Sequence, residues 1–275
     1  MITLVIRTFW SRCGALALHI LWCCLLGTTP GLAVGAVFGE DDRRKLTADE
    51  ATYPVRKALG RLTCRHPDTG NQLVGTAAII DTGTADEGHE VLITAAHVVM
   101  DPNTGKPLDD CRFKVAGRFW GSDPVVGIRA GAFDGRPHTN ADDWAVVIVA
   151  TSDPADHRLP LWPGNEIPEQ VALLGYRGDR RGLWVSDGCH VHRPQGGEAL
   201  HGTSVWLSDC DASPGASGAP LLVHHQGEWY WGGLYRGHLY DPDKHPRTPL
   251  RQPAFSARDA MNVIVRLPKP TAKSF

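Results

Sequence analysis

Short apolar runs recur along most of the chain, and clusters of Gly, Pro and Asp separate them. Runs of this kind, rich in Val, Ile, Leu and Trp and bounded by turn residues, predict the strands of an all-β sandwich or barrel. We expect strands within residues 74–80, 90–99, 112–117, 124–130, 144–150, 170–176, 182–188, 203–209, 219–225 and 228–237.

Helical periodicity is nearly absent from the chain. Only the residues just after His97 and the stretch "SARDAMNVIV" near the C-terminus have a pattern compatible with a helix. Residues 151–169 contain four prolines and little periodicity, so they predict a connector between two β halves. We therefore divide the chain into an N-terminal segment (1–36), a leader with a first β unit (37–155) and a second β unit (156–275).

The N-terminal segment has the features of a secretory signal. Arg7 and Arg12 precede the apolar run "CGALALHILWCCLLGTTPGLAVGAVFG", which Pro30 interrupts and small residues follow. This pattern predicts cleavage near Gly35 or Ala36 and a mature chain that begins close to "VFGEDDRRK". The alternative is an uncleaved anchor, because the run approaches the length needed to span a bilayer. We expect a secreted or periplasmic protein, with membrane contact only if the segment is retained.

Composition limits the classes of partner. The 275 residues are 42% hydrophobic, enough for a core of one compact domain or two small ones. A net charge of -2 provides no basic surface to neutralise phosphates, which argues against nucleic acid as the main partner. We expect a monomer.

Four of the seven cysteines lie beyond the N-terminal segment: Cys64, Cys111, Cys189 and Cys210. An even number in an exported chain predicts two disulfides, and three connectivities are open. The simplest pairing is sequential, with one disulfide in each half of the chain. A zinc site is the competitor, but there is no CxxC pair, and "CHVH" alone is a weak signal.

Three residues at strand ends could carry chemistry. His97 follows the apolar run in "LITAAHVV", and two alanines before it leave room for an imidazole against the backbone. Asp143, in "ADDWAVVIVA", precedes an apolar strand and would be partly desolvated, so it needs a donor such as an imidazole NH. Asp142 is the alternative, but it lies farther from the buried run.

The third residue is Ser217, in "GASGAP". Gly215 and Gly218 permit backbone conformations that a Cβ would oppose, so the amides of Gly215 and Ser217 can turn toward one point as an oxyanion hole. Ser217 would attack a carbonyl carbon, His97 would take and return its proton, and Asp143 would hold the imidazole tautomer.

The segments "LITAAHVV", "DDWAVV" and "GASGAP" resemble the three active-site segments of chymotrypsin-like serine peptidases, above all the bacterial secreted trypsin-like and glutamyl-endopeptidase-type enzymes. The resemblance extends to "VFGEDDRRK", "YPVRKALGRLTC" and "DCDASPGASGAPLL" and covers about residues 37–237. It implies two six-stranded antiparallel β-barrels with the active site in the cleft between them. It also implies no cofactor or metal, and hydrolysis of protein or peptide substrates by a serine endopeptidase through an acyl-enzyme.

The chain departs from this family at positions that matter for activation and specificity. Ala216 stands where animal relatives carry the Asp that pairs with a freed N-terminal amine, so that switch cannot work here. Asp211 has the spacing of the acid that recognises Arg or Lys in trypsin-like relatives, but a loop Asp that caps a turn fits equally well. Tyr235 replaces the His of glutamyl-specific relatives. Arg236 could pair with Asp211 and weaken a preference for basic side chains.

Two other functions compete with a peptidase. An α/β-hydrolase esterase would need Gly-x-Ser-x-Gly and the chain order Ser, acid, His; here Ala219 occupies the last Gly, and the order differs. A catalytically inactive binding protein on the peptidase fold is the stronger alternative, although all three catalytic residue types are present.

Overall fold

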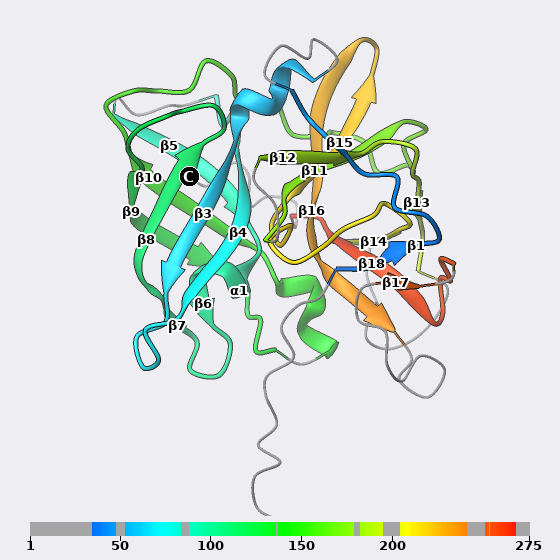
Figure 1. Cartoon of the computed structure of the whole chain (residues 1–275), viewed down its shortest axis with the longest axis horizontal. Coiled ribbons are helices and arrows are strands. Elements are labelled where there is room, and N and C mark those ends of the chain that lie inside the picture. Colours follow the sequence, from blue (N-terminus) through cyan, green and yellow to red (C-terminus); the bar gives the residue numbers. More distant parts are fainter. Residues whose placement is uncertain are drawn as a thin grey trace, which may run out of the picture. The chain divides into compact units, whose positions relative to one another are not determined.

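The computed structural model describes residues 35–47, 53–83, 88–135, 137–178, 182–194, 204–240, 251–252 and 254–267 (Figure 1). The signal sequence that we predict falls almost entirely on residues 1–34, which lie outside the described residues. Within the described ranges, no helix is long and apolar enough to cross a bilayer.

Six antiparallel strands close the first barrel in the order β10-β5-β4-β3-β8-β9. These strands are β3 (Leu59–Arg65), β4 (Gln72–Ile79), β5 (His89–Thr94), β8 (Asp109–Val115), β9 (Asp123–Ala130) and β10 (Ala145–Ala150). The short helix α1 (Ala96–Val99) follows β5, where the sequence predicts a turn of helix. A small ribbon follows α1 and consists of β6 (Met100–Asp101) and β7 (Lys106–Pro107).

The second half is an antiparallel sheet in the order β13-β14-β18-β16-β15-β11-β12-β2. Its strands are β2 (Arg44–Lys45), β11 (Val171–Tyr176), β12 (Leu183–Ser186), β13 (Val191–His192), β14 (Val205–Ser208), β15 (Pro220–His225), β16 (Glu228–Tyr240) and β18 (Ala260–Val265). A parallel pair forms from β1 (Val37–Phe38) and β17 (Arg251–Gln252), and 3₁₀ helices span Pro54–Ala58 and Pro137–Asp142. The predicted all-β fold with two barrels is confirmed.

The expectation of a C-terminal helix is wrong. The stretch "SARDAMNVIV" contributes β18, which pairs with both β14 and β16. All six residues of β18 are buried, so the strand has no polar face and no alternation that would mark it as a strand in the sequence. A short apolar run of this kind cannot be told from a buried helix by periodicity alone.

Both disulfides follow the sequential pairing, which is thereby confirmed. Cys64 on β3 is bonded to Cys111 on β8, and Cys189 to Cys210, with S–S distances of 2.02 and 2.12 Å. The first staples two neighbouring strands of the barrel, and the second anchors the loop that leads to Ser217. In the chain-entropy model each contributes about 3 to 4 kcal/mol of stability.

Candidate active site

The register of the first barrel brings His97 and Asp143 together. Strand β5 runs antiparallel to β10 with Thr94 opposite Ala145, so the residues just after β5 lie beside those just before β10. His97 Nδ1 is 2.8 Å from Asp143 Oδ2, and the backbone N–H of His97 donates to Asp143 Oδ1 at 3.0 Å. Asp143 is fully buried, whereas Asp142 is only half-buried. The carboxyl group that contacts His97 is therefore that of Asp143.

The proton on His97 can be placed from this contact. A carboxylate only accepts hydrogen bonds, so Nδ1 carries the proton and Nε2 is left as an acceptor. Nε2 is buried and has no hydrogen-bond partner within the described residues. An imidazole in this state can take a proton from a hydroxyl group placed next to it.

The loop that carries Ser217 lies against β4. Thr76 donates its backbone N–H to the Ser217 carbonyl at 2.8 Å and its hydroxyl to the Gly215 carbonyl at 2.9 Å. A Cβ on Gly75 would come within 2.8 Å of the Ser217 carbonyl and 2.7 Å of the Val98 side chain, which follows His97. The Ser217 carbonyl and the side chain that follows His97 therefore both lie close against Gly75. Ser217 and His97 are not yet hydrogen-bonded, and such bonds often tighten only when substrate binds.

Two glycines give the loop its shape. Gly215 and Gly218 have φ values of 95° and 81°, which residues with a Cβ rarely adopt. The amide of Ala216 donates to the Ser213 carbonyl and that of Gly218 to the Tyr235 carbonyl. Within the described part of the chain, the amides of Gly215 and Ser217 donate to no acceptor. These two N–H groups are the ones that the sequence predicts for the oxyanion hole.

Arg236 contacts Asp143 and not Asp211, so the predicted Arg236–Asp211 pair is wrong. Its Nε is 3.2 Å from Asp143 Oδ2, the oxygen that also contacts His97, and its guanidinium lies 5.2 Å from the ring centre of Phe133. Neighbouring side chains of a strand point to opposite faces, and β16 also has a bulge between Tyr235 and Gly237. As a result Tyr235 and Arg236 reach different partners.

The other two specificity candidates are buried. Tyr235 is 1% exposed and donates its hydroxyl to Asn262 Oδ1 at 3.3 Å, and burial raises its pKa. Asp211 is 4% exposed and accepts the backbone N–H groups of Phe38 at 2.8 Å and Asp42 at 3.2 Å. Of the three specificity candidates, only Arg236 contacts Asp143.

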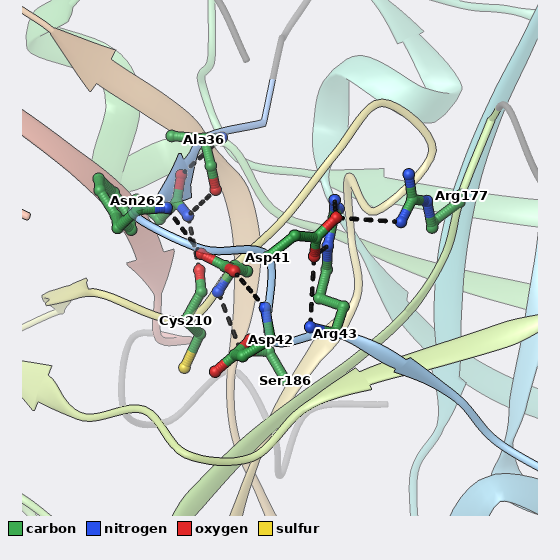
Figure 2. A network of polar contacts seen from close by, with 10 residues as sticks. Ala36, Asp41, Asp42, Arg43, Arg177, Ser186, Cys210 and Asn262 are labelled. Atoms are coloured by element: carbon green, nitrogen blue, oxygen red, sulfur yellow. Dashed lines mark hydrogen bonds and ion pairs between the residues drawn. The ribbon is translucent and has the colours of Figure 1, made fainter. Parts of the chain in front are cut away.

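Residues 36–42 contact the loop that leads to Ser217. In animal relatives an Asp at the position of Ala216 helps to hold this loop, and Ala216 has no carboxylate for that role. Figure 2 shows Asn262 between Ala36 and Cys210: its amide donates to both carbonyls, at 3.0 and 2.7 Å. The amide of Ala212 also donates to the Ala36 carbonyl at 2.9 Å. Ser186 Oγ accepts the Asp211 N–H and donates to Asp42, which completes the network. Backbone groups of Ala36, and the side chain of Asp42 through Ser186, therefore contact the loop that precedes Ala216, where animal relatives use an Asp and a freed amine.

Some of these contacts left weak signals in the sequence. An arginine inside the apolar stretch "WYWGGLYRGHLY" must find an anionic partner when buried, which could have marked Arg236 as a residue near a carboxylate. Which carboxylate it meets depends on strand register. The contacts of Ala36 with Asn262 join residues at the two ends of the described chain, and no local pattern announces them.

The fold, in which the residues after β5 and before β10 bring His97 to Asp143, is that of chymotrypsin-like serine peptidases. The model of the trypsin-like peptidase domain matches residues 75–230, and the chain belongs to this family of serine peptidases. No curated protein matches the chain.

Solved structures show the same fold at low sequence identity. A Glu endopeptidase in complex with MPD aligns with a TM-score of 0.58 and 14% identity, over 84% of this chain and 93% of that one. The protease Anisep from Arthrobacter nicotinovorans aligns with a TM-score of 0.56 and 14% identity, over 81% and 93% of the two chains. The thermostable serine protease AL20 from an extremophilic microorganism gives 0.55 and 14%, over 76% and 91%.

Proposed function

We propose that the protein is a secreted serine endopeptidase that hydrolyses peptide bonds through Ser217, His97 and Asp143. The observation that carries this is the His97–Asp143 contact, which leaves the buried Nε2 of His97 without a hydrogen-bond partner among the described residues. The two disulfides suit an oxidising compartment such as the periplasm or the cell exterior.

The chemistry follows from these positions. Ser217 Oγ attacks the carbonyl carbon of the substrate while His97 Nε2 takes its proton, and the negative charge that forms on the carbonyl oxygen is stabilised by the amides of Gly215 and Ser217. His97 then gives the proton to the leaving amine, and an acyl-enzyme remains on Ser217. Water then attacks the acyl carbon while the same imidazole takes its proton, the ester bond to Ser217 Oγ breaks, and His97 returns the proton to Oγ as the acid product leaves. Asp143 stays ionised throughout and stabilises the imidazolium.

Arg236 would serve substrate selection on one side of the scissile bond. It is the specificity candidate that adjoins His97 and Asp143, and its side chain keeps 14% of its surface exposed. Because its neighbour Tyr235 takes the place of the His of glutamyl-specific relatives, we assign Arg236 to the side chain that precedes the scissile bond. Asp211 and Tyr235 would act indirectly: Asp211 holds residues 38–42, and Tyr235 holds Asn262 of β18.

A fluorophosphonate probe tests the nucleophile. We expect the probe to label wild-type protein on Ser217 and to leave Ser217→Ala and His97→Ala unlabelled, with turnover reduced about a millionfold in the serine variant. Ser213→Ala is the matched control, because Ser213 lies in the same loop, is also buried and has a hydroxyl group without a hydrogen-bond partner in the described residues.

Two results would contradict the proposal. Labelling that persists in Ser217→Ala, or that is lost in Ser213→Ala with the fold intact, would place the nucleophile elsewhere. Folded wild-type protein that neither reacts with the probe nor cleaves casein would instead indicate the binding protein on a peptidase fold. Equal thermal unfolding temperatures of wild type and variants show that the fold is retained.

A further inference from the structure

A pocket of about 510 Å³ lies beside the loop that carries Ser217. One wall is the segment from Tyr176 to Gly178, and the Gly178 amide donates to the Pro214 carbonyl at 2.6 Å. The Tyr176 amide donates to Thr76 Oγ1 at 2.9 Å, the hydroxyl that donates in turn to Gly215. The pocket is thus built onto the residues that shape the oxyanion loop, and its size suits a peptide side chain.

Other lining residues come from three strands of the first barrel: Arg61 on β3, Val74 on β4 and Lys114 on β8. Lys114 on β8 is directly opposite Arg61 on β3, and Arg61 is directly opposite Thr76 on β4. Directly opposite residues of antiparallel strands share a face of the sheet. Lys114, Arg61 and Thr76 therefore form a row, which extends from two cations to the residue that contacts the Ser217 loop.

The pocket carries unneutralised positive charge. Four of its lining residues are cationic, Arg61, Lys114, Arg118 and Arg177, and none is acidic among the described residues. Two of them already contact carboxylates: Arg118 with Asp123 and Asp153, and Arg177 with Asp41 (Figure 2).

The other two cations face each other without a carboxylate. In the described residues, Arg61 forms no ion pair, and Lys114 donates only to the backbone carbonyl of Phe119. Like charges directly opposite each other destabilise a sheet. An anionic ligand bound in the pocket would offset the repulsion between Arg61 and Lys114.

The loop that carries Ser217 is hydrogen-bonded to β4, whose Val74 lines the pocket, and to β16, which carries Arg236. The Ser217 carbonyl is bonded to Thr76 of β4, and the next amide, that of Gly218, is bonded to Tyr235 of β16. A peptide that crosses Ser217 therefore has its two halves on the β16 side and on the β4 side. Since Arg236 is assigned to the half before the scissile bond, the pocket takes the half that leaves.

We propose that this pocket is a subsite that binds an acidic side chain of the substrate, Asp or Glu, on the C-terminal side of the scissile bond. The proposal rests on the peptidase function proposed above. It gives Arg61 and Lys114 the role of specificity residues that act through charge, without contact with the reacting atoms.

Matched fluorogenic peptides test the subsite. A neutral peptide that the enzyme cleaves is varied to Glu, Gln or Lys at one position at a time, over three positions on each side of the cleaved bond. We expect Glu at one position after the bond to raise kcat/KM about twofold to fivefold over Gln, and Lys to lower it, as for charge pairs near the surface. High salt reduces this preference.

Variants assign the preference to the pocket. In the double variant Arg61→Gln with Lys114→Gln, the ratio of kcat/KM for the Glu peptide to kcat/KM for the Gln peptide falls to about one. Arg65→Gln is the matched control, since Arg65 lies on the same strand, is exposed and contacts Asp110 outside the pocket. Its Glu to Gln ratio stays at the wild-type value.

The outcomes separate this proposal from the proposed function. If Ser217 is labelled and peptides are cleaved without regard to charge, or if the preference for Glu survives in the double variant, the subsite is refuted and the peptidase stands. A preference for Glu only before the bond would also overturn the subsite. If no variant or wild type reacts with the probe, the peptidase assignment fails, and the subsite fails with it.

Discussion

Asp211 has a buried carboxyl group where residues 38–42 meet the loop that leads to Ser217. Burial raises the pKa of this group from 3.8 to about 7, and the nearby charge of Asp42 acts in the same direction. The backbone N–H groups of Phe38 and Asp42 favour the ionised form, but they do not outweigh the loss of solvation.

The sign of the effect on stability follows from this pKa. Between about pH 4 and pH 7 the carboxyl group is protonated in the folded chain and ionised in the unfolded chain, so the folded state binds more protons. Stability from this group is therefore complete below pH 4 and is lost as the pH rises through 7. A shift of about three units corresponds to about 4 kcal/mol of unfolding free energy.

Asp211→Asn removes this titration and keeps the shape of the side chain. Urea unfolding of wild type and variant at pH 4 and pH 8 gives the difference in unfolding free energy at each pH. We expect the wild type to lose about 4 kcal/mol relative to the variant between the two values. Asp68→Asn, at an exposed position, is the control for general charge effects.

A difference that is the same at both pH values would refute this reasoning. A difference that grew in favour of the wild type with rising pH would show that the two N–H donors, and not burial, dominate. In that case Asp211 would hold residues 38–42 as an ionised carboxylate.

Two further changes test the site. Arg236→Gln removes the cation whose Nε is 3.2 Å from the buried Asp143 carboxylate, so we expect the unfolding free energy to fall by about 1 to 3 kcal/mol in urea unfolding. Unchanged stability would show that the contact with Asp143 has no electrostatic role. Gly218→Ala would place a Cβ against Thr94 Oγ1 and the Thr76 carbonyl, at a residue whose φ is 81°. We therefore expect the unfolding free energy, measured in urea, to fall by at least ~2 kcal/mol, and activity to be lost. Gly227→Ala, at a φ of 85° with open space around it, costs only about 1 to 2 kcal/mol, and equal losses would contradict the steric argument.

Most strands could be predicted because their signal is local. The run "WAVVIVA" is apolar at nearly every position and begins after a turn, and it forms β10 within one residue of the expected start. The prediction of a helix at β18 was wrong because it too relied on the local pattern, and a short buried run contains no pattern that separates a strand from a helix. The pairing of β18 with β14 and β16 decided the matter.

The site shows the same division. His97, Asp143 and Ser217 stand out in the sequence because each follows or precedes a strand or lies between glycines, and the structure places the first two in contact. Arg61 carries no such mark. It is an ordinary charged residue on an alternating strand, and its position opposite Lys114 and Thr76 exists only once three strands are in register.

By itself the sequence determined the all-β class, most strands and the residues that can do chemistry, because each of these depends on patterns within a few neighbouring residues. Only the tertiary structure decided which partner each charged group has. Arg236 meets Asp143 and not Asp211, and Asp211 meets backbone groups 173 and 169 residues away. The reason is physical: a buried charge takes the partner that strand register and burial place within about 3 Å, and neither quantity is encoded locally.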